Sequence, residues 1–464
     1  MKIALVYPRT INQFKSNLFP LGIVYLATIL EHKNYKVKIF DSSWDEDLDK
    51  VKDKIKSFNP NIVGIGVTSD LMEHAKEMIN FSKKLDAFTV LGGPHASVAP
   101  KSSLEFIEGL DFVVVGEGEE TFLELIKELE ENKRNYEIKG LAFRKNKEIV
   151  INSPRLKLAD INELPFPDRD LIPNYDRYLN SGIIGVSLLR GCPFNCKFCQ
   201  PAERKIFGNK IRFRNPKNIV EEIKLLVEEY GPKEFYISND LFTMDREWIE
   251  QIYKELRQQN LLDKVKFIVL SRVDLFDEEL ASLLKKMNVI RILFGVESGS
   301  QKILDYLNKK TNLRMIKKAF SIAKRYKIKT HALFILGTPL ETRKTLLKTS
   351  KLIEELEPTQ VMFSLFTALP GTYLYEEFKE KNMLSLQTYD QYDFYEFSEF
   401  GPNIELQNIK YEELIKFKDN ILEKRKKKML IQNAISFLKD INFKDYKKLI
   451  SRWKTYQRCK DFFG

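Results

Sequence analysis

Three closely spaced cysteines are the strongest chemical signal in the sequence. They lie in the segment Arg190-Gly191-Cys192-Pro193-Phe194-Asn195-Cys196-Lys197-Phe198-Cys199. Three thiolates on one loop can bind three irons of a cubane iron–sulfur cluster and leave the fourth iron without a protein ligand. A chelating substrate or cofactor could bind at that open iron. The spacing therefore predicts a 4Fe–4S cluster held by Cys192, Cys196 and Cys199.

Two other interpretations of the cysteines are weaker. A disulfide framework would spread paired cysteines along a short secreted chain, whereas this chain has four cysteines and the fourth, Cys459, stands alone near the C-terminus. We interpret Cys459 as an incidental thiol on a terminal helix. A structural zinc site would need a fourth Cys or His at a suitable spacing, and the nearest candidate, His331, lies on a different predicted strand. We therefore favour the cluster.

Strands that alternate with helices from Gly182 onward must position the cysteine loop. We predict strands at 183–189, 234–238, 266–271, 289–295, 329–336 and 359–366, and helices at 216–230, 246–259, 278–286, 315–326 and 341–357. Repeated βα units of this kind predict an open (βα)6 partial TIM barrel, whose functional residues lie at the C-terminal ends of the strands. The cysteine loop directly follows the first of these strands.

The N-terminal part of the chain shows a similar alternation. We predict strands at 2–7, 37–41, 61–67, 89–92 and 112–115, with helices at 21–32, 45–57, 71–85, 102–108 and 121–131. This order predicts an α/β, doubly wound, Rossmann-like domain with right-handed crossovers. Ligands of such sheets bind outside the carboxyl ends of the strands, where small or polar residues occur in this chain.

These patterns divide the chain into four predicted regions. The Rossmann-like domain covers residues 1–131, and a linker at 132–181 holds a hairpin and a proline-rich passage that cannot continue a helix or a central strand. The partial barrel covers 182–400. A basic, helical C-terminal region covers 401–464.

Composition predicts a cytoplasmic globular protein. Hydrophobic residues make up 43% and charged residues 30% of the chain, which is ordinary for such proteins. The N-terminus resembles a short buried strand more than a signal peptide, and no apolar run approaches the roughly 20 residues of a transmembrane helix. Of the net charge of +11, residues 401–464 contribute 16 Lys and Arg against 8 Asp and Glu. Such a basic run could meet an acidic substrate, a lipid surface or RNA, but is more often a solvated helix face.

The cysteine spacing, with the aromatic Phe198 just before the last cysteine, resembles the signature of the radical S-adenosylmethionine (SAM) superfamily. The resemblance implies that the amino and carboxylate groups of SAM chelate the open iron, and that reductive cleavage gives a 5′-deoxyadenosyl radical. It also implies an external one-electron reductant such as flavodoxin or ferredoxin.

Segments after the later barrel strands resemble the same superfamily. By this resemblance Asp240 lies near the methionine amino group, although the preceding Asn239 stands where acidic residues are common. Arg272 pairs with the methionine carboxylate. Glu297, followed by Ser298, accepts from a ribose hydroxyl or from the amino group. Each of these side chains could instead be a satisfied polar group at the end of the barrel.

The N-terminal part resembles the cobalamin-binding domain that is fused to one large branch of this superfamily. The resemblance is carried by Phe19-Pro20-Leu21-Gly22, Gly92-Gly93-Pro94-His95-Ala96 and Val115-Gly116-Glu117-Gly118-Glu119-Glu120-Thr121. Glycines at strand ends permit close approach of the backbone to a flat corrin or its nucleotide tail. The implied contacts are Thr68, Ser69, Gly92, Gly93, His95, Gly116 and Glu117.

The identity of the axial ligand stays open. At Asp41-Ser42-Ser43 a serine stands where the ligand motif of other cobalamin domains has histidine. The resemblance therefore implies that no such histidine binds the cobalt from the lower face of the corrin. His95 could touch the corrin or could serve only as a hydrogen-bonding group.

The resemblance implies a cobalamin-dependent radical SAM methyltransferase acting on an unactivated carbon of a small molecule or lipid-like substrate. One alternative is a radical SAM cyclase or carbon-skeleton rearrangement enzyme, with or without cobalamin. Another is a non-catalytic corrinoid or cluster carrier. Action on nucleic acid is disfavoured, because tRNA methylthiotransferases bind a second cluster through three N-terminal cysteines and residues 1–190 contain none.

Overall fold

The computed structural model describes residues 1–9, 18–44, 48–155, 160–199, 204, 206–239, 241–393, 397 and 401–439, with side chains up to 431. Two compact units make up the chain, Met1–Tyr411 and Glu412–Gly464. Two residues singled out from the sequence, Asp240 and Cys459, lie outside the described residues.

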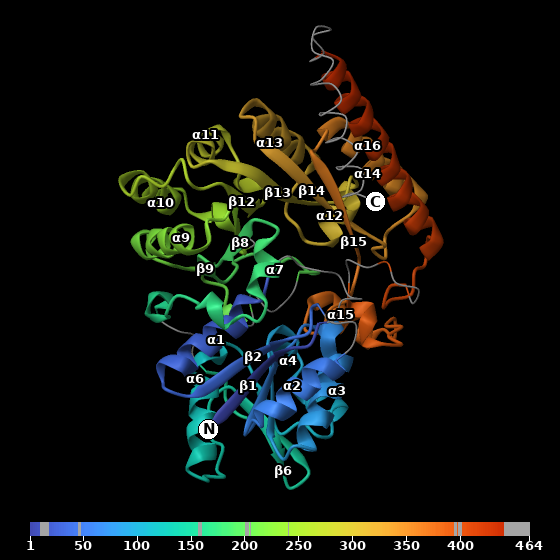
Figure 1. Cartoon of the computed structure of the whole chain (residues 1–464). Coiled ribbons are helices and arrows are strands. Elements are labelled where there is room, and N and C mark those ends of the chain that lie inside the picture. Colours follow the sequence, from blue (N-terminus) through green and yellow to red (C-terminus); the bar gives the residue numbers. More distant parts are fainter. Residues whose placement is uncertain are drawn as a thin grey trace. The chain divides into compact units, whose positions relative to one another are not determined.

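A seven-stranded sheet forms the N-terminal part of the first unit (Figure 1). Its strands are β1 (Lys2–Tyr7), β2 (Lys36–Asp41), β3 (Ile62–Gly66), β4 (Phe88–Gly92), β5 (Phe112–Val114), β6 (Leu141–Lys145) and β7 (Glu148–Ile151). They lie in the order β2-β1-β3-β4-β5-β6-β7, and the first five are parallel. The strand order reverses between β1 and β3, and ligands of doubly wound sheets bind outside that point.

Helices cover both faces of this sheet, as the doubly wound prediction requires. They are α1 (Leu21–His32), α2 (Asp49–Phe58), η1 (Ser69–Leu71), α3 (Met72–Lys83), α4 (Pro94–Val98), α5 (Pro100–Phe106) and α6 (Gly118–Glu130). One apolar core joins the sheet to α2, α3 and α5, and a second joins it to α1 and α6. Figure 1 shows these two groups on opposite sides of the strands.

The predicted hairpin forms, as β6 and β7, and it extends the N-terminal sheet. β6 pairs antiparallel with β5, with Phe112 opposite Phe143 and Val114 opposite Leu141. Leu141, Ala142 and Phe143 are all buried, which explains why this strand joins a core. The sequence showed a hairpin but could not show its partner, because pairing between strands is non-local.

A second sheet of six parallel strands forms the partial barrel, and its order is β15-β14-β13-β12-β11-β8. The strands are β8 (Ile183–Val186), β11 (Glu234–Ile237), β12 (Phe267–Ser271), β13 (Val289–Glu297), β14 (Lys329–Leu336) and β15 (Gln360–Leu365). The helices beside them are α9 (Pro216–Tyr230), η4 (Phe242–Met244), α10 (Arg246–Gln258), η5 (Val273–Leu275), α11 (Glu278–Lys286), α12 (Gln301–Tyr306), α13 (Leu313–Arg325) and α14 (Arg343–Leu356). The predicted α/β class with a partial barrel is confirmed.

Local sequence sets the ends of the barrel helices. At α9 the Asn215 side chain accepts from the backbone N–H of Lys217, Pro216 occupies the first turn, and Gly231 ends the helix in a left-handed conformation. Each of these residues is favoured at its position because it satisfies or avoids an unpaired backbone group. The predicted bounds of α9 therefore match the structure.

Short elements connect the two sheets, and a small ribbon precedes and follows the cysteine loop. They are η2 (Ile161–Glu163), η3 (Arg169–Leu171), α7 (Tyr175–Leu179) and the two-stranded ribbon of β9 (Leu189–Arg190) with β10 (Arg212–Phe213). The buried Arg169 of η3 donates to Glu222 of α9 at 3.0 Å and to the Gly185 carbonyl at 3.0 Å. The connection is thus fixed to the barrel by a buried ion pair.

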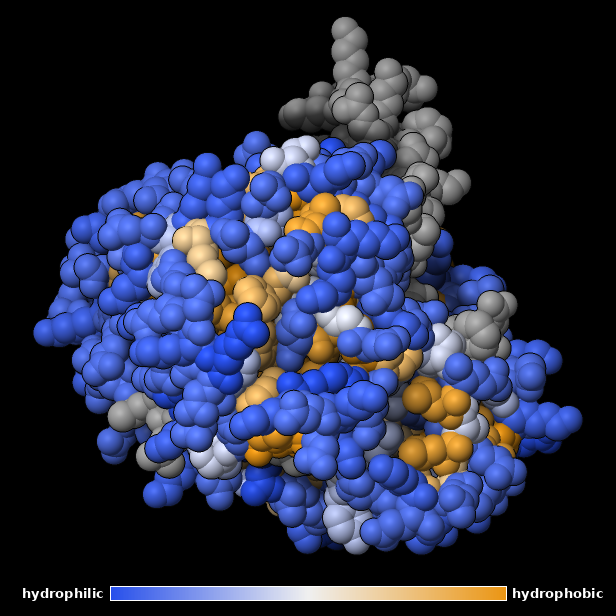
Figure 2. All heavy atoms as spheres, turned by 90° about the horizontal axis from the view of Figure 1, so that it is seen from below, coloured by the Kyte–Doolittle hydropathy of each residue, from blue (hydrophilic) through white to orange (hydrophobic). Residues whose placement is uncertain are grey.

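The described part of the predicted C-terminal region is helical, and residues 440–464 lie outside the described residues. After the barrel come α15 (Tyr373–Glu380), η6 (Tyr389–Tyr392) and α16 (Tyr411–Lys439). No helix in the described part of the chain is both long enough and apolar enough to cross a membrane. The face in Figure 2 is largely hydrophilic, with small groups of hydrophobic side chains between charged ones. Scattered apolar groups of this kind are normal on protein surfaces.

Candidate functional site

The cysteine loop begins at a backbone position that only glycine can occupy. Gly191 has a φ of +103°, and a Cβ there would lie 2.5 Å from the carbonyl oxygen of Lys210. The next residue, Cys192, donates its N–H to the Gly208 carbonyl at 3.2 Å. The loop therefore leaves the β9–β10 ribbon in a direction set by close backbone packing.

Backbone hydrogen bonds also hold the middle of the loop. The Lys197 N–H donates to the Leu307 carbonyl at 3.0 Å, and the Lys197 carbonyl accepts from Leu374 at 3.3 Å. The Asn308 side chain donates to the Asn195 carbonyl at 2.6 Å. Between these anchors, none of the three cysteines forms a disulfide, and all three are partly exposed. These hydrogen bonds fix the backbone of the loop against neighbouring segments.

Arg272, at the C-terminal end of β12, is buried and holds the loop. Its guanidinium donates to both oxygens of Asp274 at 3.0 and 2.9 Å, and to the Lys309 carbonyl at 2.7 Å. It also donates to the Cys196 sulfur at 3.7 Å and lies 3.8 Å from the centre of the Phe194 ring. A guanidinium has five N–H donors, so one N–H of Arg272 has no partner among these bonds and is available for the methionine carboxylate that the family resemblance implies.

A buried ion pair lies beside Arg272. Lys309 donates to Glu297 at 2.6 Å, and its ammonium lies 5.9 Å from the centre of the Phe198 ring. Burial opposes the charge of Lys309, but attraction to Glu297 and to Cys196 outweighs it and raises the Lys309 pKa above its usual value. The site therefore keeps a cation beside the cysteine loop.

The backbone around Glu297 is shaped to hold this pair. Glu297 has a φ of 64°, which side-chain-bearing residues rarely adopt, and the register between β13 and β14 shifts at this point. A Cβ at Gly295 would lie 2.6 Å from the Glu297 carboxylate and 2.7 Å from the Lys309 ammonium. Gly295 therefore leaves the space that the ion pair fills.

These residues fit an iron–sulfur cluster with bound SAM. Three thiolates concentrate negative charge, and Arg272 and Lys309 supply cationic donors beside them; hydrogen bonds to sulfur stabilise and tune such ligands. Among the described side chains, no three His, Cys, Asp or Glu converge on one metal ion. Each cysteine of a cubane cluster binds a different iron, so convergence on a single point is not required.

The remaining barrel candidates have local structural partners. Phe198 packs in an apolar cluster with Ile303, Leu307 and Phe366. The Ser298 hydroxyl accepts from the Ser300 N–H at 3.1 Å, which shapes the turn after β13. Asn239 bonds to the Leu188 N–H at 2.7 Å and the Leu189 carbonyl at 2.8 Å, so it ties β11 to the strand before the loop. Asp240 lies outside the described residues, and its role stays a prediction.

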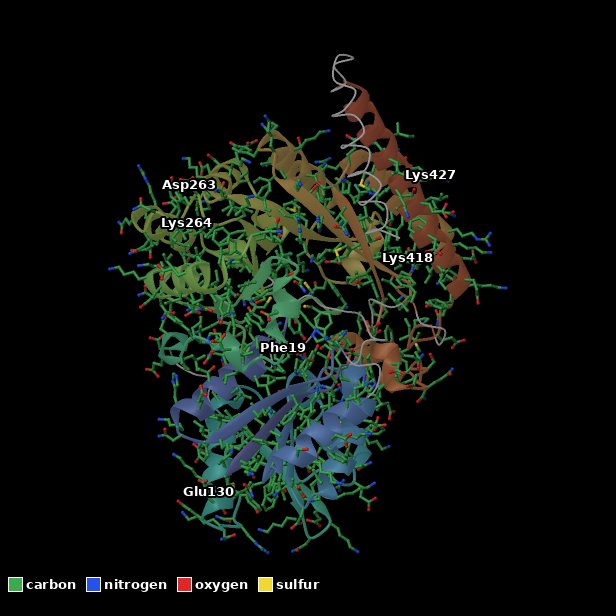
Figure 3. All side chains as sticks on the ribbon, in the orientation of Figure 1. Phe19, Glu130, Asp263, Lys264, Lys418 and Lys427 are labelled. Atoms are coloured by element: carbon green, nitrogen blue, oxygen red, sulfur yellow. The ribbon has the colours of Figure 1, made fainter. Side chains whose placement is uncertain are left out.

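The second group of predicted residues lies at the C-terminal strand ends of the N-terminal sheet. In Figure 3, Phe19 and Glu130 mark the two ends of this sheet, with Glu130 near the chain's N-terminus, where its side chain accepts from the Met1 amine at 3.1 Å. At the end marked by Phe19, Ser69 and His95 form a hydrogen bond of 2.8 Å through His95 Nδ1.

His95 is a buried and neutral histidine. Burial lowers its pKa to about 4, and its Nε2 atom has no hydrogen-bond partner among the described residues. Tyr389 of η6 lies edge-on to the imidazole, with 5.8 Å between ring centres. Thr68 donates to Asp70, which also pairs with Arg9 at 3.0 Å. An orphaned polar atom thus lies at the C-terminal ends of β3 and β4, next to the switch point of the sheet, where a ligand is expected.

The three candidate glycines differ in what surrounds them. A Cβ at Gly93 would lie 2.9 Å from the backbone of Val67, so Gly93 is needed for packing. At Gly92 and Gly116, by contrast, a Cβ would meet nothing within 4 Å. These two glycines leave open space beside the backbone, and together with the His95 Nε2 atom they fit the close approach of a corrin or its tail.

Glu117, the last of these candidates, contacts the barrel. Its carboxylate accepts from Arg190 at 2.7 Å and from Arg212 at 2.9 and 3.0 Å. Glu119 accepts from Arg190 at 2.6 Å. Burial raises the pKa of Glu117, but hydrogen bonds from Arg212 and Arg190 outweigh burial and hold the pKa below its usual value.

Sequence analysis missed Lys309, Arg190 and Arg212. Lys309 follows Asn308 and precedes Lys310, and nothing in that run marks one lysine as buried. Arg190 lies next to Gly191 in the cysteine segment, which was a usable signal. The contacts of Arg212 depend on pairing between distant segments.

Comparison with known proteins identifies both parts of the chain. The model of the radical SAM superfamily matches residues 186–353, and the model of the B12-binding domain matches residues 10–126. A solved structure of the radical SAM methyltransferase TsrM from Kitasatospora setae, with cobalamin and a 4Fe–4S cluster bound, has a TM-score of 0.68 at 20% identity. The likeness covers 82% of this chain and 75% of TsrM, and it shows a shared fold.

Two curated relatives are more similar in sequence. The uncharacterised methyltransferase PH0819 of Pyrococcus horikoshii is 33% identical over 396 residues, which cover 83% of this chain and 84% of the relative. The anaerobic magnesium-protoporphyrin IX monomethyl ester cyclase of Cereibacter sphaeroides is 29% identical over 82% of this chain and 64% of its own length. Because PH0819 matches over most of both chains, the chain belongs to the radical SAM enzymes that carry a B12-binding domain, whose cofactors are a 4Fe–4S cluster, SAM and cobalamin.

Proposed function

We propose that the protein transfers a methyl group to an unactivated carbon of a small or lipid-like molecule. One observation carries the proposal furthest: the cysteine loop of the barrel is joined, through Arg190, to the strand-end turn of the N-terminal sheet at Glu117. The sites expected to hold the two metal cofactors therefore lie on connected segments of one compact unit. The kinship with PH0819 supports methyl transfer.

Cys192, Cys196 and Cys199 would hold the cluster in this proposal. When bound, the cofactors supply a carbon-centred radical and a transferable methyl group. The chain's own residues would bind and orient these cofactors. An ammonium has three donors, and Glu297 takes one from Lys309, so the others would bind the methionine carboxylate of SAM together with the remaining N–H of Arg272.

Glu297 would use its second carboxylate oxygen for SAM. Its first oxygen accepts from Lys309, and the second would accept from the SAM amino group or a ribose hydroxyl. At the N-terminal sheet, Gly92, Gly116, Ser69 and His95 would contact cobalamin, with Thr68 shaping the turn through Asp70.

The external one-electron reductant would be a flavodoxin or a ferredoxin. Pro193 and Asn195 of the cysteine loop are exposed, and Arg204 donates to the Asn195 side chain at 2.6 Å. An exposed loop with basic neighbours such as Arg204 and Lys197 supports docking of an acidic electron carrier.

The test follows the methyl group. Anaerobically prepared holoprotein, a reductant and SAM with a deuterated methyl group are incubated with a small-molecule extract of the source cells. Mass spectrometry should find a product that carries the deuterated methyl, together with 5′-deoxyadenosine and S-adenosylhomocysteine. The Cys196→Ala variant should form neither the labelled product nor 5′-deoxyadenosine. Consumption of SAM without label in any product would contradict methyl transfer.

The same experiment separates the second candidate function. The similarity to the cyclase of Cereibacter sphaeroides favours a ring-forming reaction as the alternative. A cyclase would give 5′-deoxyadenosine and a rearranged product without the deuterated methyl. That outcome would replace the methyltransferase proposal.

A further inference from the structure

Four charged side chains join the two sheets at the base of the cysteine loop. Arg190 and Arg212 lie directly opposite each other on the β9–β10 ribbon. Both reach the turn after β5, where Arg190 bonds to Glu117 and Glu119, and Arg212 bonds to Glu117. We refer to these four residues as the ribbon cluster.

The ribbon cluster is largely shielded from water. The exposed fraction of the side chains is 5% for Glu117, 11% for Glu119, 11% for Arg190 and 16% for Arg212. The Arg190 guanidinium also lies near two aromatic rings, 5.3 Å from the centre of Phe207 and 5.9 Å from that of Tyr25. Shielded, charge-assisted hydrogen bonds of this kind are strong and directional.

The ribbon needs these carboxylates. Two cations directly opposite each other on an antiparallel pair repel, and each strand here is two residues long. Glu117 lies between the two arginines and accepts from both. The geometry at the start of the cysteine loop therefore depends on a carboxylate from the other sheet.

The ribbon cluster also links two sites along the backbone. Gly116, where open space lies beside the backbone, directly precedes Glu117. Arg190 is followed by the conformationally fixed Gly191 and then by Cys192. A ligand at Gly116 and a cluster at Cys192 are thus connected through one ion pair.

We propose that Glu117 and Glu119 are positioning residues that fix the cysteine loop relative to the ligand site of the N-terminal sheet. This inference rests on the proposed function. It assigns the acidic turn Gly116-Glu117-Gly118-Glu119 to the alignment of the two metal cofactors, whereas sequence analysis had placed Glu117 among the cobalamin contacts.

The first arm of the test measures the contact itself. Hydrogen–deuterium exchange of the peptide covering residues 189–199 is compared in wild-type holoprotein, Glu117→Gln, Glu119→Gln and Glu120→Gln. Glu120 is a matched control, because it lies on the same turn but is exposed and pairs with Arg155. We expect roughly tenfold faster exchange in Glu117→Gln and no change in Glu120→Gln. Equal exchange in all four proteins would overturn the proposal.

The second arm measures alignment, which a merely structural role would leave unchanged once the cofactors are bound. Pulsed EPR gives the distance between the cobalt of cob(II)alamin and the reduced cluster, in samples with equal iron and cobalt content. Wild type and Glu120→Gln should give one narrow distribution, and Glu117→Gln a broader or shifted one. An unchanged distribution in Glu117→Gln would overturn the proposal.

The two claims fail in different ways. Wild-type protein that binds iron but no added hydroxocobalamin would contradict the proposed function, and the exchange arm would still decide whether the ribbon cluster holds the loop. If Glu117→Gln does not fold, Glu119→Gln, which removes one hydrogen bond of Arg190 only, takes its place in both arms.

Discussion

The Lys309–Glu297 ion pair is the residue-scale feature on which the proposed SAM site depends. Sequence analysis found Glu297 because it follows a predicted strand. It could not find Lys309, because a lysine becomes a buried partner only when the fold brings it to a carboxylate. Gly295, whose Cβ would collide with both groups, shows that the backbone is shaped around the pair.

Removal of one partner should destabilise the protein. Lys309→Met leaves the buried Glu297 carboxylate without its cation, which should lower the free energy of unfolding by about 3–5 kcal/mol. Lys309→Met/Glu297→Met, which removes both charges, should recover most of this loss. Anaerobic denaturant titration measures the free energy of unfolding of both variants and of wild type. If Lys309→Met is as stable as wild type, the pair is not buried as described.

The same double variant separates stability from binding. Because it lacks the ammonium and the carboxylate proposed to contact SAM, it should keep its cluster but form little 5′-deoxyadenosine. Normal cleavage of SAM by this variant would remove Lys309 and Glu297 from the proposed site.

Glu341 predicts a pH-dependent stability. Glu341 lies buried after β14, and this burial raises its pKa to about 7. Hydrogen bonds from Thr345 and Gly337 lower the pKa, but they do not offset the effect of burial. The folded state therefore keeps a proton that the unfolded state releases at about pH 4.5. This contribution is complete at low pH and is lost as the pH rises through the folded pKa.

The variant Glu341→Gln should lack this dependence. Between pH 5 and 8, wild type should lose about 2.5 kcal/mol of unfolding free energy relative to the variant. Chemical denaturation of both proteins across this range gives the difference directly. A constant difference would mean that Glu341 titrates at an ordinary pKa.

At the scale of elements, sequence periodicity located the regular strands and helices well. The bounds of β1, α1, α9 and α11 agree with the prediction because each has a clear apolar pattern or clear end signals. The two-residue strands β9 and β10 were missed, since so short a ribbon has no periodicity. Sequence patterns also could not identify β5 as the strand that pairs with the β6–β7 hairpin.

Glycines at strand ends could be listed from the sequence but not told apart. The structure separates Gly93, which packs on Val67, from Gly92, which faces open space. Positive φ and close packing explain why glycine is needed at position 93, and room for a ligand explains the glycine at position 92.

This difference yields a matched pair of variants. Gly92→Ala should fold normally and should weaken cobalamin binding by about 1–3 kcal/mol, roughly five- to a hundredfold, because its methyl group fills the open space. Gly93→Ala should destabilise the fold itself, since its Cβ would meet the Val67 backbone. Spectroscopic titration with hydroxocobalamin and thermal unfolding distinguish the two. Undiminished affinity in Gly92→Ala would place cobalamin elsewhere.

At the scale of the whole molecule, the sequence predicted two α/β parts and the cofactors that their motifs imply. The sheet order β2-β1-β3-β4-β5 and the six-stranded partial barrel agree with that prediction. How the parts meet was not predictable, because Glu117 and Arg190 are 73 residues apart and their pairing follows from the complete fold. The predicted boundaries at 131, 181 and 400 stay predictions.

The central claim is that the three cysteines hold a cluster while a separate site binds cobalamin. The most direct measurement is the iron, sulfide and cobalt content of anaerobically isolated protein. Wild type should hold about four irons and one cobalt per chain. The variant Cys192→Ala/Cys196→Ala/Cys199→Ala should lose the iron and keep the cobalt. Iron that stays in the triple variant, or wild-type protein without cobalt, would contradict the account.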